Sequence, residues 1–335
     1  MTKLSVIFPV YNVEKYVRSS LESIFRQGLD EADFEIIIVN DGSKDQSMDV
    51  IQDIINEHSN ISVINQENQG LSMARNNGMA KAIGEYILMP DSDDLLIDNS
   101  LPVLLEKAVE SKADLIVADF LQMKDDEIDK LSTIEQPLLK VKKKKGCELY
   151  MQDLNPNECY VWHTLYRRLF LEEKRIKFVP GITCQDIPFT HECYLRSDDC
   201  IKINLLLNIY RRRQMSATSF FDKRKSLDLC AAIAATWKLR NIEGLTKDLK
   251  LRLCDNVFVS FNLLFYVMLR GVNSRTERGE IYARLHNLAP DLTFSHGIRQ
   301  KVTTFIYKLS PALFYSFRRV VQMVLTMTHK CLARL

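Results

Sequence analysis

The sequence predicts an α/β fold with a mostly parallel central sheet flanked by helices, followed by a helical C-terminal region. Three observations lead to this prediction. Over the first 120 residues, short apolar runs rich in β-branched residues alternate with segments of helical periodicity, and polar residues follow each run. From about residue 221 the apolar spacing is helical throughout. Strict alternation of strand and helix is typical of a parallel sheet covered on both faces.

Four strands and four helices are predicted within this first region. The strands are 4–10, 34–43, 61–66 and 85–91, and the helices are 14–27, 44–59, 70–84 and 100–111. The strands of a parallel sheet end at one edge, where ligands bind. The polar clusters PVYN, NDGS, NQGLSMARNN and DSDD each follow a predicted strand, so we expect them to converge there.

Composition limits the classes of function. A chain of 335 residues that is 46% hydrophobic can bury a large core, and its net charge of +2 argues against a nucleic-acid partner. The eight cysteines show no CxxC pair and no zinc spacing, which indicates reduced thiols in a cytoplasmic compartment. We expect no secretion signal, and the longest strongly apolar window, 257–269, is shorter than the ~20 residues of a bilayer span.

Three acids follow the fourth predicted strand in the stretch YILMPDSDDLL: Asp91, Asp93 and Asp94. Such close charges repel unless a positive group lies among them. Asp91 and Asp93 can point at one Mg²⁺ or Mn²⁺ ion, which would bridge them to a diphosphate. The alternative is a polar turn that caps the next helix. The chain has neither GxGxxG nor GxxxxGK[ST], which argues against a dinucleotide site or a P-loop.

The segments SVIFPVYNVEKYVRSSLESIFRQ, FEIIIVNDGSKDQS and NQGLSMARNNGMAKAIGEYILMPDSDDLL together resemble family 2 glycosyltransferases with the GT-A fold. The resemblance covers about the first 120 residues. It implies a nucleotide-diphospho-sugar transferase-like fold and transfer of a sugar, most often from a UDP-sugar, with inversion at the anomeric carbon. It also assigns nucleotide contacts to Pro9, Tyr11, Glu14, Asp41, Arg75 and Asp91, and metal contacts to Asp91 and Asp93.

Other readings of these residues stay open. Asp41 could be a turn residue, because Asp-Gly is a common turn pair. Arg75 could be a solvated helix residue or a salt-bridge partner, and Tyr11 could simply pack rather than stack on a base.

The segment 161–189 resembles the second half of the same family, where an acidic pair follows an LYRR stretch. That pair is usually Glu-Asp, and here it is Gln185-Asp186. The resemblance implies that Asp186 is the catalytic base, which takes the proton of the acceptor hydroxyl; a turn or helix cap is the alternative. Which of Arg211, Arg212 and Arg213 faces the site is left open. The charged, weakly periodic segment 124–146 is expected to be a mobile excursion from the nucleotide domain.

The chain is therefore divided into a GT-A domain, 1–220, and a helical region, 221–335. Within the first, 1–120 is the nucleotide-sugar half and 121–220 the acceptor and catalytic half. The tail 298–335 interleaves basic and apolar residues and has no acid, which is typical of a helix on an anionic membrane surface. Packing on the chain's own body or in a homo-oligomer is the alternative. Pro311 should divide the tail into two helices.

The predicted function is an inverting, metal-dependent glycosyltransferase that uses Mg²⁺ or Mn²⁺. Its donor is a nucleotide-sugar, and its acceptor is a saccharide of a surface glycan or a lipid-linked saccharide. It is expected in the cytoplasm or peripherally on the inner face of the membrane, without nucleic acid. Two alternatives remain: a nucleotidyltransferase, and a non-catalytic nucleotide-sugar-binding protein of the same fold. The second stays open because Gln185 stands where the family usually has a glutamate.

Overall fold

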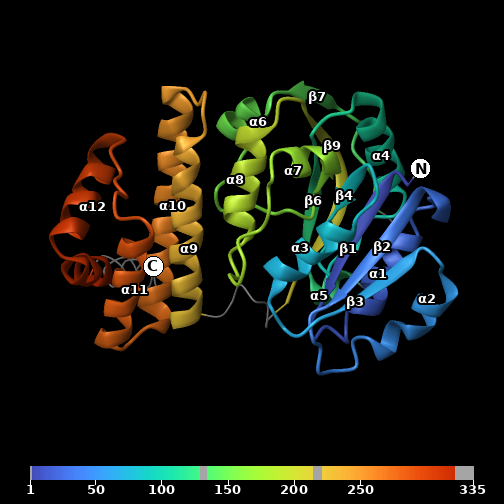
Figure 1. Cartoon of the computed structure of the whole chain (residues 1–335), viewed down its shortest axis with the longest axis horizontal. Coiled ribbons are helices and arrows are strands. Elements are labelled where there is room, and N and C mark those ends of the chain that lie inside the picture. The colour runs from blue at the N-terminus through green and yellow to red at the C-terminus, as the bar shows by residue number, and fades with distance from the viewer. Residues whose placement is uncertain (1, 129–133, 214–220, 321–335) are drawn as a thin grey trace, which may run out of the picture. The chain divides into compact units, whose positions relative to one another are not determined.

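A computed structural model of the chain describes residues 2–128, 134–213 and 221–320 (Figure 1). Contacts divide the chain into two compact units, Met1–Ala217 and Thr218–Leu335. The first unit is built around a nine-stranded sheet, and the described part of the second consists of helices and their connections. This is the α/β sheet with a helical C-terminal region that the sequence predicts.

The elements of the first unit follow in chain order. They are β1 (Leu4–Val10), α1 (Val17–Phe25), η1 (Glu31–Asp33), β2 (Phe34–Asn40), η2 (Asp49–Ile51), α2 (Gln52–Glu57), β3 (Ile61–Asn65), α3 (Leu71–Lys81), β4 (Tyr86–Leu88), β5 (Leu95–Leu96), α4 (Ser100–Ser111), β6 (Leu115–Lys124), α5 (Asp125–Ile128), β7 (Val141–Lys144), α6 (Gly146–Gln152), β8 (Thr164–Arg167), α7 (Arg168–Glu173), α8 (Asp186–Arg196) and β9 (Cys200–Arg212). The η elements are 3-10 helices.

The strand order is β3-β2-β1-β4-β8-β6-β9-β5, and β7 pairs with β9. All pairs among β1 to β4 are parallel, as predicted. The second half of the sheet is mixed, because β8 is antiparallel to β4 and β6, whereas β6 and β9 are parallel. Strands β4, β6 and β9 therefore run in the same direction and end at the same edge (Figure 1).

Both faces of the parallel half are covered, which explains why β1 reads as an uninterrupted apolar run. Val6 and Phe8 share one core cluster with Leu21 of α1 and Leu104 of α4. Ile7 points to the other face, against α3. A Cβ built on Gly78 would lie 2.3 Å from Cγ2 of Ile7, so only glycine allows this close approach of α3 to β1.

Two predicted segments differ from the structure. The helix expected over 44–59 is helical only over η2 and α2, because residues 43–47 instead hydrogen-bond the turn after β1: Ser47 Oγ, for example, accepts from the Val13 N–H at 2.8 Å. The expected excursion over 124–146 was wrong in its described part. It contains α5 and β7, and β7 pairs with β9. The side chains of β7 are largely exposed, so the strand has no apolar alternation.

The second unit contains α9 (Lys223–Lys238), η4 (Leu239–Asn241), α10 (Lys247–Gly271), α11 (Arg275–Leu288), α12 (Gly297–Leu309) and a further helical stretch over 311–320. Ser310 separates the last two, so Pro311 does begin a new helix. Within the described residues, α10 is the one helix long and apolar enough to cross a bilayer by length and composition. Of its apolar window, 61% is buried, as in the core helix of a helical bundle.

Candidate active site

The loop after β4 gathers three carboxylates. Oxygens of Asp91, Asp93 and Asp94 lie within 4.8 Å of one another. Asp94 is 2% exposed; its Oδ1 accepts a hydrogen bond from the Arg211 N–H at 2.8 Å, and its Oδ2 has no hydrogen-bond partner within the part of the chain that the structure describes. Burial, reinforced by the charges of Asp93 and Asp91, raises the pKa of Asp94 well above its ordinary value. Burial also raises the pKa of Asp91, against the opposing effect of Arg75.

Arginines from two distant segments partner these acids. Arg75 of α3 is 2% exposed and reaches Asp91 Oδ1 through Nη2 at 2.5 Å. Arg213 forms an ion pair with Asp93, and Arg211 Nε donates to the Asp93 carbonyl at 2.9 Å. Arg211 and Arg213 are thus the two of the three consecutive arginines that contact the acidic loop.

Tyr16 completes this arrangement on the α1 side of the sheet. Its ring receives the guanidinium groups of Arg211 and Arg213 at 4.9 and 5.1 Å from the centroid. Arg211 also pairs with Asp125 at 2.5 Å. Hydrogen bonds from Lys15 and Arg211 lower the pKa of Asp125 to about 2. These residues line a cavity of about 1270 Å³ with five basic and two acidic side chains, an environment that favours an anionic group.

The three carboxylates fit a hard divalent cation. They supply oxygen atoms from a single loop, the ligand type that Mg²⁺ and Mn²⁺ prefer. Asp91 and Asp93 are partly exposed, so an ion could reach them, and Asp94 Oδ2 offers an unused acceptor. Asp94 was not among the residues that the sequence assigned to the metal. Its place beside the DxD pair in DSDD was the available signal.

The residues predicted to bind the nucleotide lie at the ends of β1 and β2. Pro9 is buried within β1, whereas Tyr11 just beyond it is 45% exposed, as a stacking ring would need to be. Glu14 is exposed, and its Oε2 accepts from the Gln46 N–H at 2.9 Å. It therefore holds the 43–47 loop in place.

Asp41 is more engaged than the sequence indicated. Its buried carboxylate accepts three hydrogen bonds: from Gln66 Nε2 at 2.7 Å, from the Gln69 N–H at 2.8 Å and from the Gly70 N–H at 2.9 Å. Since a carboxylate offers about four acceptor positions, a nucleotide base could use only the one that is left. What the geometry shows is that Asp41 orders the loop that begins α3.

Helix α3 also fixes the segment that leads to Asp186. The Asn76 side chain donates to the Phe178 carbonyl at 2.9 Å and accepts from the Phe178 N–H at 3.0 Å. Ser72 Oγ accepts from the Gly181 N–H at 3.0 Å. The Arg75 guanidinium lies 5.6 Å from the centroid of the Phe178 ring. One helix therefore holds both the arginine of the acidic loop and the approach to the predicted base.

Asp186 is the first residue of α8. Its Oδ1 accepts from the Ile187 N–H at 3.1 Å. Burial raises its pKa to about 6; Arg75 opposes this shift and Asp91 adds to it. The structure thus brings Asp186 into electrostatic reach of the acidic loop. The preceding Gln185 is 2% exposed, and its Oε1 has no hydrogen-bond partner in the described ranges. An acid at this position would add another buried charge to this cluster.

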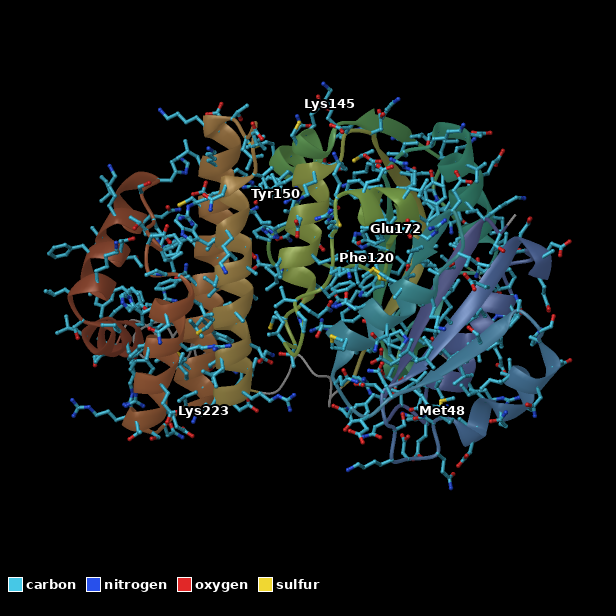
Figure 2. All side chains as sticks on the ribbon, viewed as in Figure 1. Met48, Phe120, Lys145, Tyr150, Glu172 and Lys223 are labelled. Carbon is cyan, nitrogen blue, oxygen red and sulfur yellow. The ribbon has the colours of Figure 1, made fainter. Side chains whose placement is uncertain are left out.

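The sequence patterns did not predict an aromatic cluster that lies beside α8. Tyr160 stacks on Trp162 with centroids 4.9 Å apart, and Trp162 on Tyr210 at 5.6 Å. Phe120 of β6, labelled in Figure 2, meets Trp162 edge-on. Thr190 Oγ1 donates to the Cys159 carbonyl at 3.1 Å, which fastens this segment to the first turns of α8. The signal available was the spacing of aromatic residues in YVWHTLY, next to LYRR.

The sequence profile of glycosyl transferase family 2 matches residues 5–173, half of the chain. The chain belongs to this family. A similar protein is EpsJ of Bacillus subtilis (strain 168), an uncharacterized glycosyltransferase, which is 33% identical over 221 residues, covering 64% of this chain and 62% of EpsJ. The glycosyltransferase GlyA of Streptococcus pneumoniae serotype 4 is 31% identical over 238 residues, covering 66% of this chain and 32% of GlyA. The chain thus spans less than two thirds of these relatives' length.

Solved structures confirm the GT-A fold class of this family 2 member. S. aureus TarS 1–349 in complex with UDP-GlcNAc superposes with a TM-score of 0.69 at 18% identity, covering 95% of this chain and 88% of TarS 1–349. A mannosyltransferase from Pyrobaculum calidifontis in complex with GDP-Man and Mn²⁺ gives 0.53 at 12% identity, covering 95% and 87%. At these identities the likeness shows the fold alone.

Proposed function

We propose that the chain is an inverting, metal-dependent glycosyltransferase that moves a sugar from a UDP-sugar to a hydroxyl of a saccharide or lipid-linked saccharide acceptor. The observation that carries this proposal is the convergence of Asp186, Arg75 and the three acids of the loop after β4. The glycosyltransferase names of the family 2 relatives and the UDP-GlcNAc bound to TarS support it.

We assign donor binding to residues 1–120. Tyr11 would stack on the base beside Pro9, Glu14 and the remaining acceptor position of Asp41, and Arg75 would meet the diphosphate. Asp91 and Asp93 would hold the divalent cation, with Asp94 as a third ligand. The cation, when bound, supplies positive charge that stabilises the leaving diphosphate.

Residues 121–220 would supply the catalytic step. The acceptor oxygen attacks the anomeric carbon, the bond from that carbon to the diphosphate oxygen breaks, and the acceptor proton passes to Asp186. A single base is sufficient, because an in-line displacement has no covalent intermediate. With a pKa of about 6, Asp186 is ionised at neutral pH and still more basic than an ordinary aspartate. Gln185 carries no charge in this scheme.

The aromatic cluster would bind the acceptor. Tyr160 and Tyr210 are partly exposed next to α8, and their rings can pack against the apolar C–H face of a pyranose. Trp162 is buried and stacks on both tyrosines, and the partly exposed Phe120 meets Tyr160 and Trp162 edge-on, so these contacts fix the positions of the rings. Ring contacts of this kind orient a sugar without identifying it, so we assign the acceptor only as a saccharide.

A panel of nucleotide-sugars, incubated with Mn²⁺ and with or without saccharide acceptors, tests the proposal. Release of nucleoside diphosphate that is accelerated by an acceptor is the expected result. A nucleotidyltransferase would instead release pyrophosphate from a nucleoside triphosphate and a sugar phosphate. A non-catalytic binding protein would be thermally stabilised by a nucleotide-sugar and would release no diphosphate with any acceptor.

A further inference from the structure

The last described helices of the second unit expose large apolar side chains. The residues are Ile298, Val302, Phe305 and Leu309 on α12 and Leu313, Phe317 and Val320 on the stretch 311–320, and their exposure ranges from 49% to 82%. Successive members are three or four positions apart, so within each helix they share one face. We call these seven residues the apolar stripe.

Polar contacts fix the opposite face of α12 against the rest of the unit. Gln300 is buried; its Nε2 donates to Asp255 Oδ1 at 2.6 Å, and its Oε1 accepts from the His296 N–H at 3.1 Å. Thr304 Oγ1 accepts from the Phe294 N–H at 2.9 Å and donates to the Phe294 carbonyl at 3.0 Å. Turning the apolar stripe inward would break these bonds, so the helix presents its apolar side outward.

The stretch 311–320 is held in the same way. Phe314 and Tyr315 are buried, and the Phe314 ring lies 4.7 Å from that of Phe265 of α10. Arg318 donates to Asn262 Oδ1 at 2.9 Å. The inner side of this stretch therefore already has its ring and hydrogen-bond partners, and its outward side chains stay exposed. Among the described residues 298–320, packing on the chain's own body does not account for the apolar stripe.

Charge indicates what covers the stripe. Residues 292–320 include no aspartate or glutamate. Arg299, Lys301, Lys308 and Arg319 are exposed, and Lys301 and Lys308 lie beside the stripe on the helical wheel. Symmetric pairing of two copies through this face would bring the cations of one copy near those of the other, with no acid from 292–320 to offset them. An anionic surface complements them.

We propose that the apolar stripe docks the protein on an anionic lipid bilayer, with α12 and 311–320 lying in the plane of the interface. Rings and aliphatic side chains enter the headgroup and acyl boundary, and the lysines and arginines meet anionic headgroups. This placement is peripheral. It would bring the enzyme to a lipid-linked acceptor, but it does not depend on the transfer reaction.

Flotation of the 335-residue chain with vesicles rich in phosphatidylglycerol tests the docking. We expect salt-sensitive flotation of the wild type, and little flotation with pure phosphatidylcholine. Phe305→Ser with Leu309→Ser should abolish it. Lys301→Glu with Lys308→Glu should weaken partitioning by more than about 20-fold, since each basic group near such a surface favours binding by about fivefold. Both side-chain pairs are exposed, and Lys308→Glu removes a surface hydrogen bond from Lys308 Nζ to Thr293 Oγ1 at 3.0 Å, so thermal unfolding should change little.

Matched controls come from the first unit. Ile83→Ser with Leu138→Ser removes two exposed apolar side chains, and Lys142→Glu with Lys143→Glu reverses two exposed lysines, both outside the stripe. These variants should float like the wild type. The proposal would be overturned if the control variants lost as much flotation as the stripe variants. It would also be overturned if the wild type did not float at low salt. A concentration-dependent dimer that only the stripe variants dissociate, without flotation, would show that a second copy is the partner. Transfer to a soluble saccharide should be unaffected.

Discussion

The guanidinium of Arg75 lies 2.5 Å from Asp91 Oδ1, inside the protein rather than on its surface. Its Nε is buried and has no partner among the described residues, so the carboxylate of Asp91 is the main compensation for burying this charge. The same cation acts on Asp186. The pair therefore links fold stability to the two groups that we propose for donor binding and for the base.

Replacing Arg75 with methionine should destabilise the fold by about 3 kcal/mol, because it leaves the Asp91 carboxylate without its partner. Removing one partner of a buried ion pair typically costs about 3–5 kcal/mol of unfolding free energy. We expect the low end of this range because Asp91 is partly exposed. Urea unfolding at pH 7 measures the loss. Arg75→Met combined with Asp91→Asn should recover most of it, because no charge is then stranded. A loss below about 1 kcal/mol in the single variant would mean that the pair behaves like a surface ion pair.

Asp93→Ala should abolish Mn²⁺-dependent binding of UDP while the fold is retained. Stability should change little or rise slightly, because the charge of Asp93 disfavours ionisation of Asp91 and Asp94, although its ion pair with Arg213 is lost. Calorimetric titration with UDP and Mn²⁺ measures the binding. Asp98→Ala, which removes an exposed acid paired with Arg26, is the control and should bind normally. Undiminished transfer by Asp93→Ala would remove Asp93 from the metal site.

Asp186→Asn should lower kcat by about 10²–10⁴-fold, the usual contribution of a general base, and leave donor affinity nearly unchanged. In the wild type, kcat/KM should fall as the pH drops through about 6, where Asp186 becomes protonated. Glu192→Gln is the matched control on the same helix, since Glu192 pairs with Arg196 at 2.8 Å. If kcat falls in Glu192→Gln and stays at the wild-type value in Asp186→Asn, the base is Glu192.

Asp186→Asn should also change how stability depends on pH. The folded protein holds the pKa of Asp186 at about 6, above the ordinary value of 3.8, so the native state binds the extra proton between these values. The free energy of unfolding of the wild type should therefore decrease as the pH rises from 4 to 6, because Asp186 loses its proton in this range. Denaturant unfolding without metal should show the asparagine variant more stable at pH 7, by up to about 3 kcal/mol, and equal to wild type below pH 4. Equal stability at both pH values would contradict the raised pKa.

Gly78→Ala should cost about 1–3 kcal/mol, because the new methyl group would meet Ile7 Cγ2 at 2.3 Å and force α3 away from β1. Gly279→Ala in α11 is the control. A Cβ at Gly279 would meet no described atom within 4 Å. The Gly279→Ala substitution should therefore leave the free energy of unfolding unchanged or raise it by up to about 1 kcal/mol. Thermal or urea unfolding compares the two. Since α3 carries Arg75, donor affinity should fall in the Gly78 variant only.

The sequence was sufficient for features that are local in the chain. The order of β1 to β4 follows from apolar runs and helical spacing, because a strand buried on both faces needs no partner to be recognised. Asp91 and Asp93 stand two positions apart, and their pattern is complete within DSDD. Asp186 could be located only through resemblance to a family, since an isolated aspartate before a helix is common.

Pairings between distant segments could not be predicted. The Arg211 N–H and Asp94 Oδ1 are 117 residues apart, and periodicity carries no information about such partners. Strand β7 was missed because its exposed lysines form a strand through backbone bonds to β9. The engagement of Asp41 with the 66–70 loop was also hidden, because a turn aspartate and a ligand aspartate look the same in sequence.

The double hydrogen bond between Asn76 and the Phe178 backbone has a consequence for how this family can diversify. It ties the segment before Asp186 to the helix that carries Arg75, so hydrogen bonds within the first unit hold the spacing between Arg75 and the proposed base. The aromatic segment 159–163 is held by a different contact, from Thr190 Oγ1 of α8 to the Cys159 carbonyl. On the proposed assignment of its rings to the acceptor, mutations there would change which acceptor is taken without touching the Asn76–Phe178 hydrogen bonds. Reaction chemistry and acceptor choice would then evolve on separate stretches of sequence.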